Sequence, residues 1–381
     1  MDFERSEVHE GFADVVRDFA EHVIAPQADT WDREHTFPTD VVLAMGDLGL
    51  FGLPFQEKYG GSGADFTTFC IAIEEIARVD SSMAITLEAG VGLGAAPIAR
   101  FGSDEQRAQW LPDLCAGRAL AAFGLSEPDG GSDAAATRTR AALDGDEWTI
   151  DGAKAFITNS GTPITSLITV TARTGVDEIS AVIVPAGTPG LGVGPPYRKM
   201  GWHASDTHPL TFDGCRVPID HLLGERGGGL RQFLATLDDG RIAIAALAVG
   251  LAQGCLEHSV RYAGDRVAFG RPIGANQGVA FRCADLAVMV ESARLLTYKA
   301  AWLKDTGRPF KQAAAMAKLY ATEAAVDATR HATQIFGGSG YLDETPVSRF
   351  YRDAKVLEIG EGTSEIQRLV ISRGLGLPID A

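Results

Sequence analysis

The ten residues from Glu358 to Gln367 read EIGEGTSEIQ and place a glutamate on a glycine-rich turn just before an apolar helical segment. Glu361 stands between two glycines, which let the backbone bend and let a bulky partner come close to the carboxylate. Thr363 or Ser364 suits the N-cap of the apolar helix that follows, whose first N–H groups would face an anion. The stretch is also typical of a plain helix–turn–helix connection with a surface glutamate. The rest of the sequence is therefore needed to choose between a ligand site and a plain connection.

Composition places the chain among ordinary globular proteins. Its 381 residues give room for two or three domains, and 45% of them are hydrophobic and 22% charged. A net charge of −16 argues against nucleic acid or an anionic membrane as the main partner. Any anionic ligand must therefore be held by local Arg, Lys and backbone donors. The cysteines form no CxxC pair and the histidines no metal-binding spacing, which predicts reduced thiols and no metal site.

The N-terminal sequence MDFERSEVHEGF is acidic and lacks an apolar core, so we expect neither a signal peptide nor an Arg-rich transit peptide. No apolar run in the sequence suggests a membrane span. Arginine outnumbers lysine, a bias common in GC-rich bacterial genomes. Together these features predict a cytoplasmic bacterial protein.

The periodicity of apolar residues changes twice along the chain. Helical spacing runs from about Ser6 to Gly117, where Pro26 is expected to end the first helix and Ser103 with Gln106 to form a capping box. Short segments rich in Thr, Val and Ile then predict an antiparallel β domain that ends near Gly224.

Long Ala-rich amphipathic helices follow, one ending near Arg266 and two more at about Asn276–Asp305 and Phe310–Ile335, as in a four-helix bundle. The predicted fold is therefore α+β and multidomain. It has an N-terminal all-α domain over residues 1–118, a middle antiparallel β domain over 119–225 and a C-terminal four-helix bundle domain over 226–381.

Three local patterns suggest a ligand site, although each has a plainer explanation. Residues 123–133, FGLSEPDGGSD, form a strand that enters a Gly-rich loop, which suits a phosphate or a flavin edge but is also typical of a simple turn. Phe156 and Thr158 place an aromatic face and a hydroxyl on one side of a strand. This arrangement suits a flat ring as ligand, but an inward Phe in a β core is the more common explanation. Asp238 and Arg241 share a helix face, as an ordinary ion pair does.

Six stretches in this order resemble the acyl-CoA dehydrogenase family, the FAD enzymes of fatty-acid and branched-chain acyl-CoA oxidation, over essentially the whole chain. They are FGLSEPDGGSD (123–133), FITN (156–159), KMGWHASDT (199–207), DRVAFGRPIGANQ (265–277), QIFGGSGY (334–341) and EGTSEIQ (361–367). The resemblance implies FAD between the middle and C-terminal domains, an acyl-CoA substrate and an electron-transfer flavoprotein as partner. It also implies a homotetramer, a dimer of dimers, in which the neighbouring subunit holds the ADP half of the cofactor.

The resemblance also implies roles for individual residues. Cofactor contacts within one subunit would be made by Phe123, Leu125, Ser126, Ser132, Phe156, Thr158, Thr363 and Glu365, with the Thr158 hydroxyl directed at flavin N5. The neighbouring subunit would hold the ADP part with Arg266, Phe269, Gln277, Gln334, Gly337 and Gly338. The acyl-CoA would be contacted by Ser132, Asp238, Arg241 and Gly362.

Glu361 matches the catalytic base of the family, and the chemistry requires a carboxylate there. Desaturation removes a weakly acidic α-proton while a hydride passes from Cβ to the flavin. The site must therefore stabilise the enolate, by resemblance through the Glu361 backbone N–H and the FAD ribose hydroxyl, and must raise the pKa of the base by excluding water. Some branched-chain members keep the base on the first bundle helix, but here that segment reads TLDDGR, without a glutamate.

Two departures from the family pattern concern the size of the pocket. Gly360 stands where many relatives carry Tyr, which is compatible with a branched or bulky acyl group, and Phe156 stands where many carry Trp. The acyl chain depends on a pocket depth that several helices set together. The alternatives are a flavin monooxygenase or oxidase on the same scaffold, which usually lacks the carboxylate, and a partner subunit of a heteromeric dehydrogenase, which would be expected to lose the base or part of the FAD site.

Overall fold

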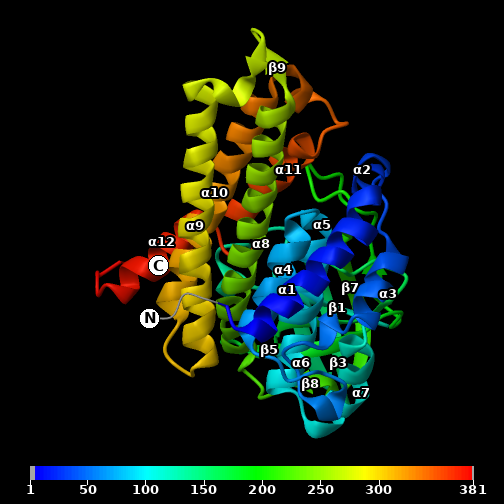
Figure 1. Ribbon diagram of the computed structural model, residues 1–381. Helices are drawn as coiled ribbons and strands as arrows, with labels where there is room; N and C mark the ends of the chain where they lie inside the picture. Colours follow the sequence, from blue (N-terminus) through cyan, green and yellow to red (C-terminus); the bar gives the residue numbers. More distant parts are fainter. Residues whose placement is uncertain (1–4, 380–381) are drawn as a thin grey trace.

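The computed structural model describes residues 5–379, and its first part is helical (Figure 1). A Ser103–Gln106 capping box starts α7, as the sequence predicts. The α-helices of this part are α1 (Glu7–Phe19), α2 (Ala25–Glu34), α3 (Thr39–Asp47), α4 (Phe66–Ala77), α5 (Ser81–Glu88), α6 (Ala96–Phe101) and α7 (Asp104–Cys115). Short 3₁₀ turns η2 (Leu50–Gly52) and η3 (Glu57–Tyr59) join α3 to α4.

The prediction that Pro26 ends the first helix is wrong. The chain continues through a π-helical turn, η1 (Ala20–Ile24), into α2, where the proline occupies the first turn. Proline lacks an N–H and its ring clashes with the preceding turn of an α-helix. A π-bulge changes the hydrogen-bond pattern at that point, so the helix can pass the proline without ending.

A second π-helical turn, η4 (Ala89–Ala95), joins α5 to α6 into one continuous helix from Ser81 to Phe101. At 21 residues and a mean hydropathy of 1.3, this helix is long and apolar enough to cross a membrane, contrary to our expectation from the sequence. However, 83% of its most apolar window is buried inside the protein, as is typical of a core helix.

The middle part is one sheet. Its strands are β1 (Leu120–Gly124), β2 (Arg140–Asp144), β3 (Glu147–Thr158), β4 (Thr165–Arg173), β5 (Ile179–Pro185), β6 (Leu191–Val193), β7 (Thr207–Pro218) and β8 (Leu222–Leu223). The strand order is β6-β7-β3-β2-β4-β5-β8, with β1 paired to β4. Most pairs are antiparallel as predicted, but β1 and β2 run parallel to β4. The β2–β3 hairpin lies between β1 and β4 in the sequence and supplies the long connection that parallel pairing needs.

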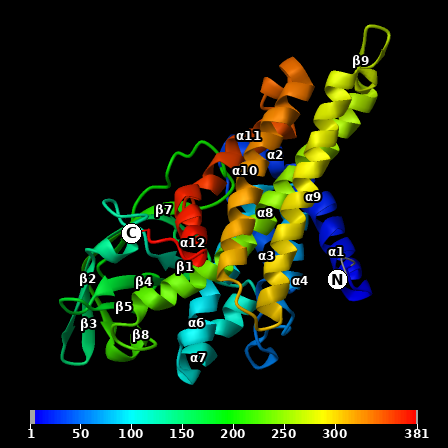
Figure 2. The ribbon, with the colours of Figure 1, turned by 90° about the vertical axis from the view of Figure 1, so that its left-hand side faces the viewer.

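The last part consists mainly of long helices. They are α8 (Gly229–Asp265), α9 (Gln277–Asp305), α10 (Lys311–Phe336), α11 (Pro346–Ala354) and α12 (Ser364–Gly374), with a hairpin of β9 (Val267–Ala268) and β10 (Arg271–Pro272) between α8 and α9. Figure 2 shows α8, α9 and α10 side by side, with the sheet and α1 on opposite sides of them. Buried alanines such as Ala246 and Ala317 let these helices pack closely. This α–β–α architecture is the predicted fold.

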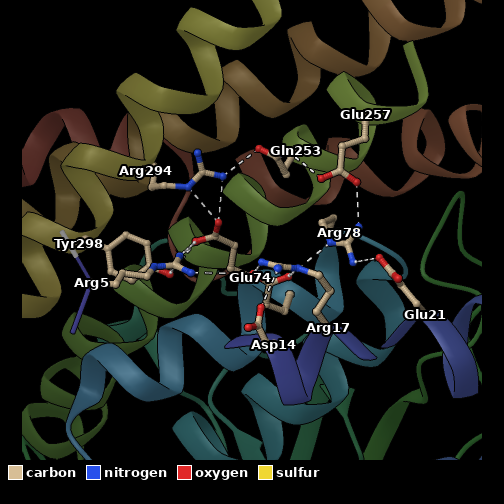
Figure 3. Close-up of polar contacts among 11 residues, drawn as sticks. Arg5, Asp14, Arg17, Glu21, Glu74, Arg78, Gln253, Glu257, Arg294 and Tyr298 are labelled. Carbon is tan, nitrogen blue, oxygen red and sulfur yellow. Dashed lines mark hydrogen bonds and ion pairs between the residues drawn. The ribbon is translucent and has the colours of Figure 1, made fainter. Parts of the chain in front are cut away.

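A buried polar network holds the first helices against the bundle (Figure 3). The carboxylate of Glu74, on α4, accepts hydrogen bonds from Arg5 at 3.2 Å, Arg294 at 3.0 Å and the Tyr298 hydroxyl at 2.6 Å. Arg78 follows α4 and donates 2.8 Å to Glu257 on α8. Because buried charges are stable only when paired, these bonds fix α4, and with it the neighbouring α5, relative to α8 and α9.

Candidate active site

A cavity of about 870 Å³ lies between the sheet, α8 and the turn before α12, within the size range of small-molecule sites. Its walls come from segments far apart in the sequence: β1, the loop after it, the end of β3, η4, α8 and residues 359–363. The predicted site residues that line it are Phe123, Leu125, Ser126, Ser132, Phe156, Thr158, Arg241, Glu361, Gly362 and Thr363.

The other predicted site residues lie outside this cavity. Asp238 is one turn from Arg241 on α8 and pairs with it, and Glu365 lies exposed in the first turn of α12. Six more are exposed at the far end of the long helices, where Figure 1 shows the β9 hairpin: Arg266, Phe269, Gln277, Gln334, Gly337 and Gly338. The ring of Phe269 is 99% exposed, so this end of the molecule presents an unusual aromatic surface.

An aromatic ring forms part of the cavity wall at the end of β3. The pairing of β3 with β7 shifts between Lys154 and Ile157, and Phe156 adopts a left-handed backbone with φ of 61°. Its ring is 68% exposed and stacks on Tyr197 at 5.2 Å between ring centroids. Thr158 follows and also lines the cavity. This irregularity turns an apolar ring out of the sheet and towards the cavity, as a flat ligand requires.

A buried ion pair anchors the Gly-rich loop after β1. Lys154, fully buried on β3, donates 2.8 Å to Glu127 and 3.2 Å to the Leu125 carbonyl. Burial lowers the pKa of Lys154 to about 8, and the Glu127 carboxylate opposes that change. Beyond the anchor, a Cβ built on Gly131 would have no atom within 4 Å, so the tip of the loop is open. No motif in the sequence points to Lys154, although its partner Glu127 lies inside the loop motif of residues 123–133.

The turn that carries Glu361 is held by its neighbours. Glu361 has φ of 53° and Gly362 has φ of 94°, both left-handed. The Gly362 carbonyl accepts hydrogen bonds from Lys318 and from Gln367, each at 2.8 Å. Thr363 caps α12 by accepting from the Ile366 N–H at 3.3 Å, which settles the choice between Thr363 and Ser364. The glutamate is therefore placed by a fixed turn.

The carboxylate of Glu361 is buried among charged groups. Neither of its oxygens meets a hydrogen-bond donor or solvent within residues 5–379. Burial raises the pKa of Glu361, whereas the neighbouring carboxyl of Glu88 and the positive charges of Lys318 and Arg241 act to lower it. Burial also lowers the pKa of Lys318 to about 8. A carboxylate whose pKa is raised by exclusion of water is suited to accepting a proton.

Gly240 of α8 makes room for this carboxylate. A Cβ built on Gly240 would lie 2.1 Å from Oε2 of Glu361, which no real side chain permits. Gly240, the glycine in TLDDGR, thus leaves the space on α8 that the carboxyl of Glu361 occupies. From the sequence alone, this segment is informative only because it lacks a glutamate.

Residues 5–379 contain no group of three or more His, Cys, Asp or Glu side chains arranged to hold a metal ion. The five cysteines lie within the described residues and none is in a disulfide. Burial raises the pKa of the Cys115 thiol to about 11, as expected of a cysteine that packs as a small apolar residue.

Comparison with known proteins identifies the family. Models of the acyl-CoA dehydrogenase N-terminal, middle and C-terminal domains match residues 6–118, 122–215 and 227–376. The chain therefore belongs to the acyl-CoA dehydrogenase family, whose members are FAD-dependent oxidoreductases.

Individual relatives match along nearly the full chain. The short-chain specific acyl-CoA dehydrogenase of Mus musculus mitochondria is 46% identical over 97% of this chain and 90% of its own length. Butyryl-CoA dehydrogenase from Megasphaera elsdenii superposes with a TM-score of 0.96 at 41% identity, over 98% of this chain and all of that one. A chain from a structure described as the electron transferring flavoprotein of Acidaminococcus fermentans has a TM-score of 0.96 at 42% identity, over 98% and 99% of the two chains.

The residues around the cavity fit an FAD. The exposed ring of Phe156 offers a face for a flat ring system, and the hydroxyls of Ser126, Ser132 and Thr158 line the same cavity. At the loop tip the backbone N–H groups of Gly131 and Ser132 donate to no backbone carbonyl within residues 5–379, which suits phosphate oxygens. The unpartnered carboxylate of Glu361 borders this cavity, beside the place that a flavin would occupy.

Proposed function

We propose that this chain desaturates a short-chain acyl-CoA thioester to the trans-2-enoyl-CoA, with Glu361 as the base that takes the α-proton and an electron-transfer flavoprotein as acceptor. One observation carries the proposal: a buried carboxylate without a hydrogen-bond donor lies at the wall of the cavity that fits a flavin. FAD, when bound, supplies the acceptor for the β-hydride. A short acyl chain is supported by the relatives named above, a short-chain specific enzyme and a butyryl-CoA dehydrogenase.

The same turn offers both groups that the reaction needs. The carboxylate of Glu361 is withdrawn from solvent, whereas the residue as a whole is only partly buried. Its backbone N–H makes no hydrogen bond within residues 5–379 and is therefore available to the thioester oxygen. A donor aimed at the oxygen that becomes negative lowers the barrier to enolate formation. The base and the oxyanion donor thus belong to one residue.

An apolar chamber beside Glu361 accommodates the acyl group. Its walls are aliphatic side chains of α5, η4, α8 and the turn before Glu361, namely Ile85, Ala89, Leu93, Leu237, Ile244 and Ile359. Once an acyl chain fills this space, water is displaced from the base and the pKa of Glu361 rises further. Substrate binding is therefore expected to activate the base.

The test is an anaerobic titration of the purified protein with acyl-CoAs of different chain length, followed by the visible absorbance of the flavin. Wild-type protein should bleach with butyryl-CoA. Glu361→Gln should keep its FAD but reduce it at least about 100-fold more slowly, because the general base is lost. Glu323→Gln, which removes a half-buried carboxylate paired with Arg368, is the matched control and should behave as wild type. A Glu361→Gln protein that bleaches at the wild-type rate would contradict the proposal.

Electron transfer and assembly need separate experiments. Reduced protein should pass its electrons to a purified electron-transfer flavoprotein much faster than to oxygen; rapid oxidation by air would instead indicate an oxidase. We also propose a homotetramer in which a second copy brings Arg266 and Phe269 to the cofactor. Their exposure supports this arrangement, because Phe269 is 99% exposed and so packs against almost nothing within residues 5–379. Light scattering should give four chains, and Arg266→Ala should lower FAD affinity without unfolding the protein.

A further inference from the structure

A second carboxyl group, on Glu88, accompanies Glu361. Glu88 is the last residue of α5 and is fully buried, and neither of its oxygens meets a hydrogen-bond donor within residues 5–379. The same holds for both oxygens of Glu361. An ionised carboxylate only accepts hydrogen bonds, so two ionised groups here would leave four buried oxygens without a donor. Buried polar atoms are rarely left so.

The two carboxyl groups meet in a space that two glycines leave open. A Cβ built on Gly240 would lie 2.1 Å from Oε2 of Glu361 and 3.6 Å from Oε1 of Glu88. A Cβ built on Gly92 of η4 would lie 2.7 Å from the same Glu88 oxygen. One oxygen of each residue thus lies within 3.6 Å of a single point, so the two carboxyls are neighbours in one buried space, and each affects the pKa of the other. A proton on one of them therefore supplies the donor that both lack.

The charges around the pair decide which carboxyl keeps the proton. Lys318 of α10 and Arg241 of α8 act on Glu361, whereas Glu361 itself is the charged group that acts on Glu88. Burial, and then the negative charge of Glu361, raise the pKa of Glu88 well above its ordinary value. Glu361 has nearby cations to stabilise its negative charge and Glu88 has none, so the proton belongs on Glu88.

Apart from Glu257 (with Arg78), His258 and the exposed Arg261 and Asp265, all in the last third of α8, the other charged groups on the elements packed against α5 have partners elsewhere, and η4 carries no charged residue. These groups are Glu74 (with Arg5 and Arg294), Glu75 (with Arg17 and Arg78), Arg231 (with Glu225), Asp238 (with Arg241 and Lys311), Asp239 (with Arg100 and Lys304), Arg349 (with Asp29 and Asp80), Arg352 (with Asp32) and Asp353 (with Ser81 and Trp202).

We propose that Glu88 stays protonated and donates a hydrogen bond to the carboxylate of Glu361, and so acts as a positioning residue for the base. The inference rests on the proposed role of Glu361. Before reaction the pair holds one proton and one negative charge. After Glu361 takes the α-proton, the pair holds two protons and no charge, and the proton of Glu88 never leaves it.

This arrangement has two opposing effects on the base. The hydrogen bond fixes the direction of the carboxylate, which favours attack on one Cα–H bond. It also stabilises the ionised form of Glu361 and so keeps its pKa below that of an equally buried lone carboxyl. The hydrogen bond thus offsets part of the effect of burial on Glu361.

The test compares Glu88→Gln with Glu88→Leu. The amide of Gln is neutral and still donates a hydrogen bond, whereas Leu has a similar size and no donor. The readout is the pH dependence of flavin reduction by saturating butyryl-CoA, measured anaerobically by stopped flow. Gln should leave the acidic limb of the profile within a few tenths of a pH unit of wild type. Leu should move that limb to higher pH by about one to two units, the size expected from losing one hydrogen bond to a charged group.

A limb that moves to lower pH in Glu88→Gln would show that Glu88 is ionised and would overturn the proposal, as would an unmoved limb in Glu88→Leu. Glu75→Gln is the control, since Glu75 is equally buried on the adjacent α4 but pairs with arginines. It should not move the limb.

A second measurement does not need turnover or the Leu variant. Infrared spectra of wild type at neutral pH should contain the C=O stretch of a protonated carboxylic acid, and Glu88→Gln should remove it while Glu75→Gln keeps it. If Glu88→Gln removes no such band, the proposal fails, whatever the kinetics show. Failure of the proposed function would give a different result. Butyryl-CoA would still reduce the flavin of Glu361→Gln at the wild-type rate, while the infrared band of Glu88 remained in the wild-type protein.

Discussion

Gly240→Ala separates the needs of catalysis from those of stability. The new methyl group would lie 2.1 Å from Oε2 of Glu361. The next nearest atoms are the carboxyl carbon of Glu361 at 3.2 Å and Oε1 of Glu88 at 3.6 Å. All three are at the ends of flexible side chains, so the carboxyl of Glu361 must move and the backbone of α8 need not. The variant therefore displaces the proposed base with little other disturbance.

The expected magnitudes differ for the two properties. Alanine is better than glycine inside a helix by about 1 kcal/mol, and crowding in a packed site costs about 1–3 kcal/mol, so the net change in the free energy of unfolding should stay within about 2 kcal/mol. A shift of the base by about 1 Å should slow flavin reduction roughly 100-fold, which equals about 2.7 kcal/mol of barrier.

Stopped-flow reduction with butyryl-CoA measures the rate, and thermal unfolding with the flavin spectrum measures stability and FAD content. Gly11→Ala on α1 is the control, because a Cβ there has no atom within 4 Å. It should be as active as wild type and slightly more stable. If Gly240→Ala reduced its flavin as fast as wild type, the carboxyl of Glu361 would not need this place and the reasoning would be refuted.

Three further predictions concern the scaffold. Lys154→Met leaves Glu127 buried without its cation, so we expect a loss of about 3–5 kcal/mol in denaturant unfolding and weaker FAD binding, partly restored by adding Glu127→Gln. Glu74→Ala should cost about 3 kcal/mol in the same assay, because it breaks the network in Figure 3, yet leave the rate of flavin reduction unchanged. A hydrogen bond with Asp32 raises the pKa of His203, so its contribution is complete below about pH 6.5 and lost as the pH rises through the folded-state value. The stability advantage of wild type over His203→Gln should therefore shrink between pH 6 and pH 8 in thermal unfolding, and a constant difference would contradict it.

The sequence was sufficient for the architecture because its signals are local and repeated. Helical periodicity over the long Ala-rich segments predicts α9 and α10 to within a residue at either end. Ser103 with Gln106 encodes its own cap, and the short Thr-, Val- and Ile-rich segments encode the strands. In the site, Glu361 and Phe156 could be named because ordered motifs surround them, and the cavity brings both together.

What the sequence did not reveal depends on distant packing. Glu88 lies in a small-residue segment that reads as plain core, and only the approach of the turn at Glu361 gives it a role. Gly240 looks like an ordinary helix glycine until a carboxyl from 121 positions further along the chain fills its missing side chain. Pro26 carries a strong local stop signal, which a π-helical turn overrides. Each of these needs the fold before its chemistry can be stated.

Backbone strain marks the same site independently. Six non-glycine residues within 5–379 have positive φ, and three of them, Phe156, Trp202 and Glu361, line the candidate active-site cavity. Such conformations cost on the order of 1 kcal/mol or more and persist only where the surroundings enforce them. Here the enforcing bonds are visible: Lys318 and Gln367 hold the carbonyl after Glu361, and Asp353 accepts from the Trp202 N–H at 2.6 Å. At Glu361 the left-handed turn leaves the N–H free while the carboxyl stays buried, so relaxing it would separate the proposed base from the proposed oxyanion donor even with every side chain retained.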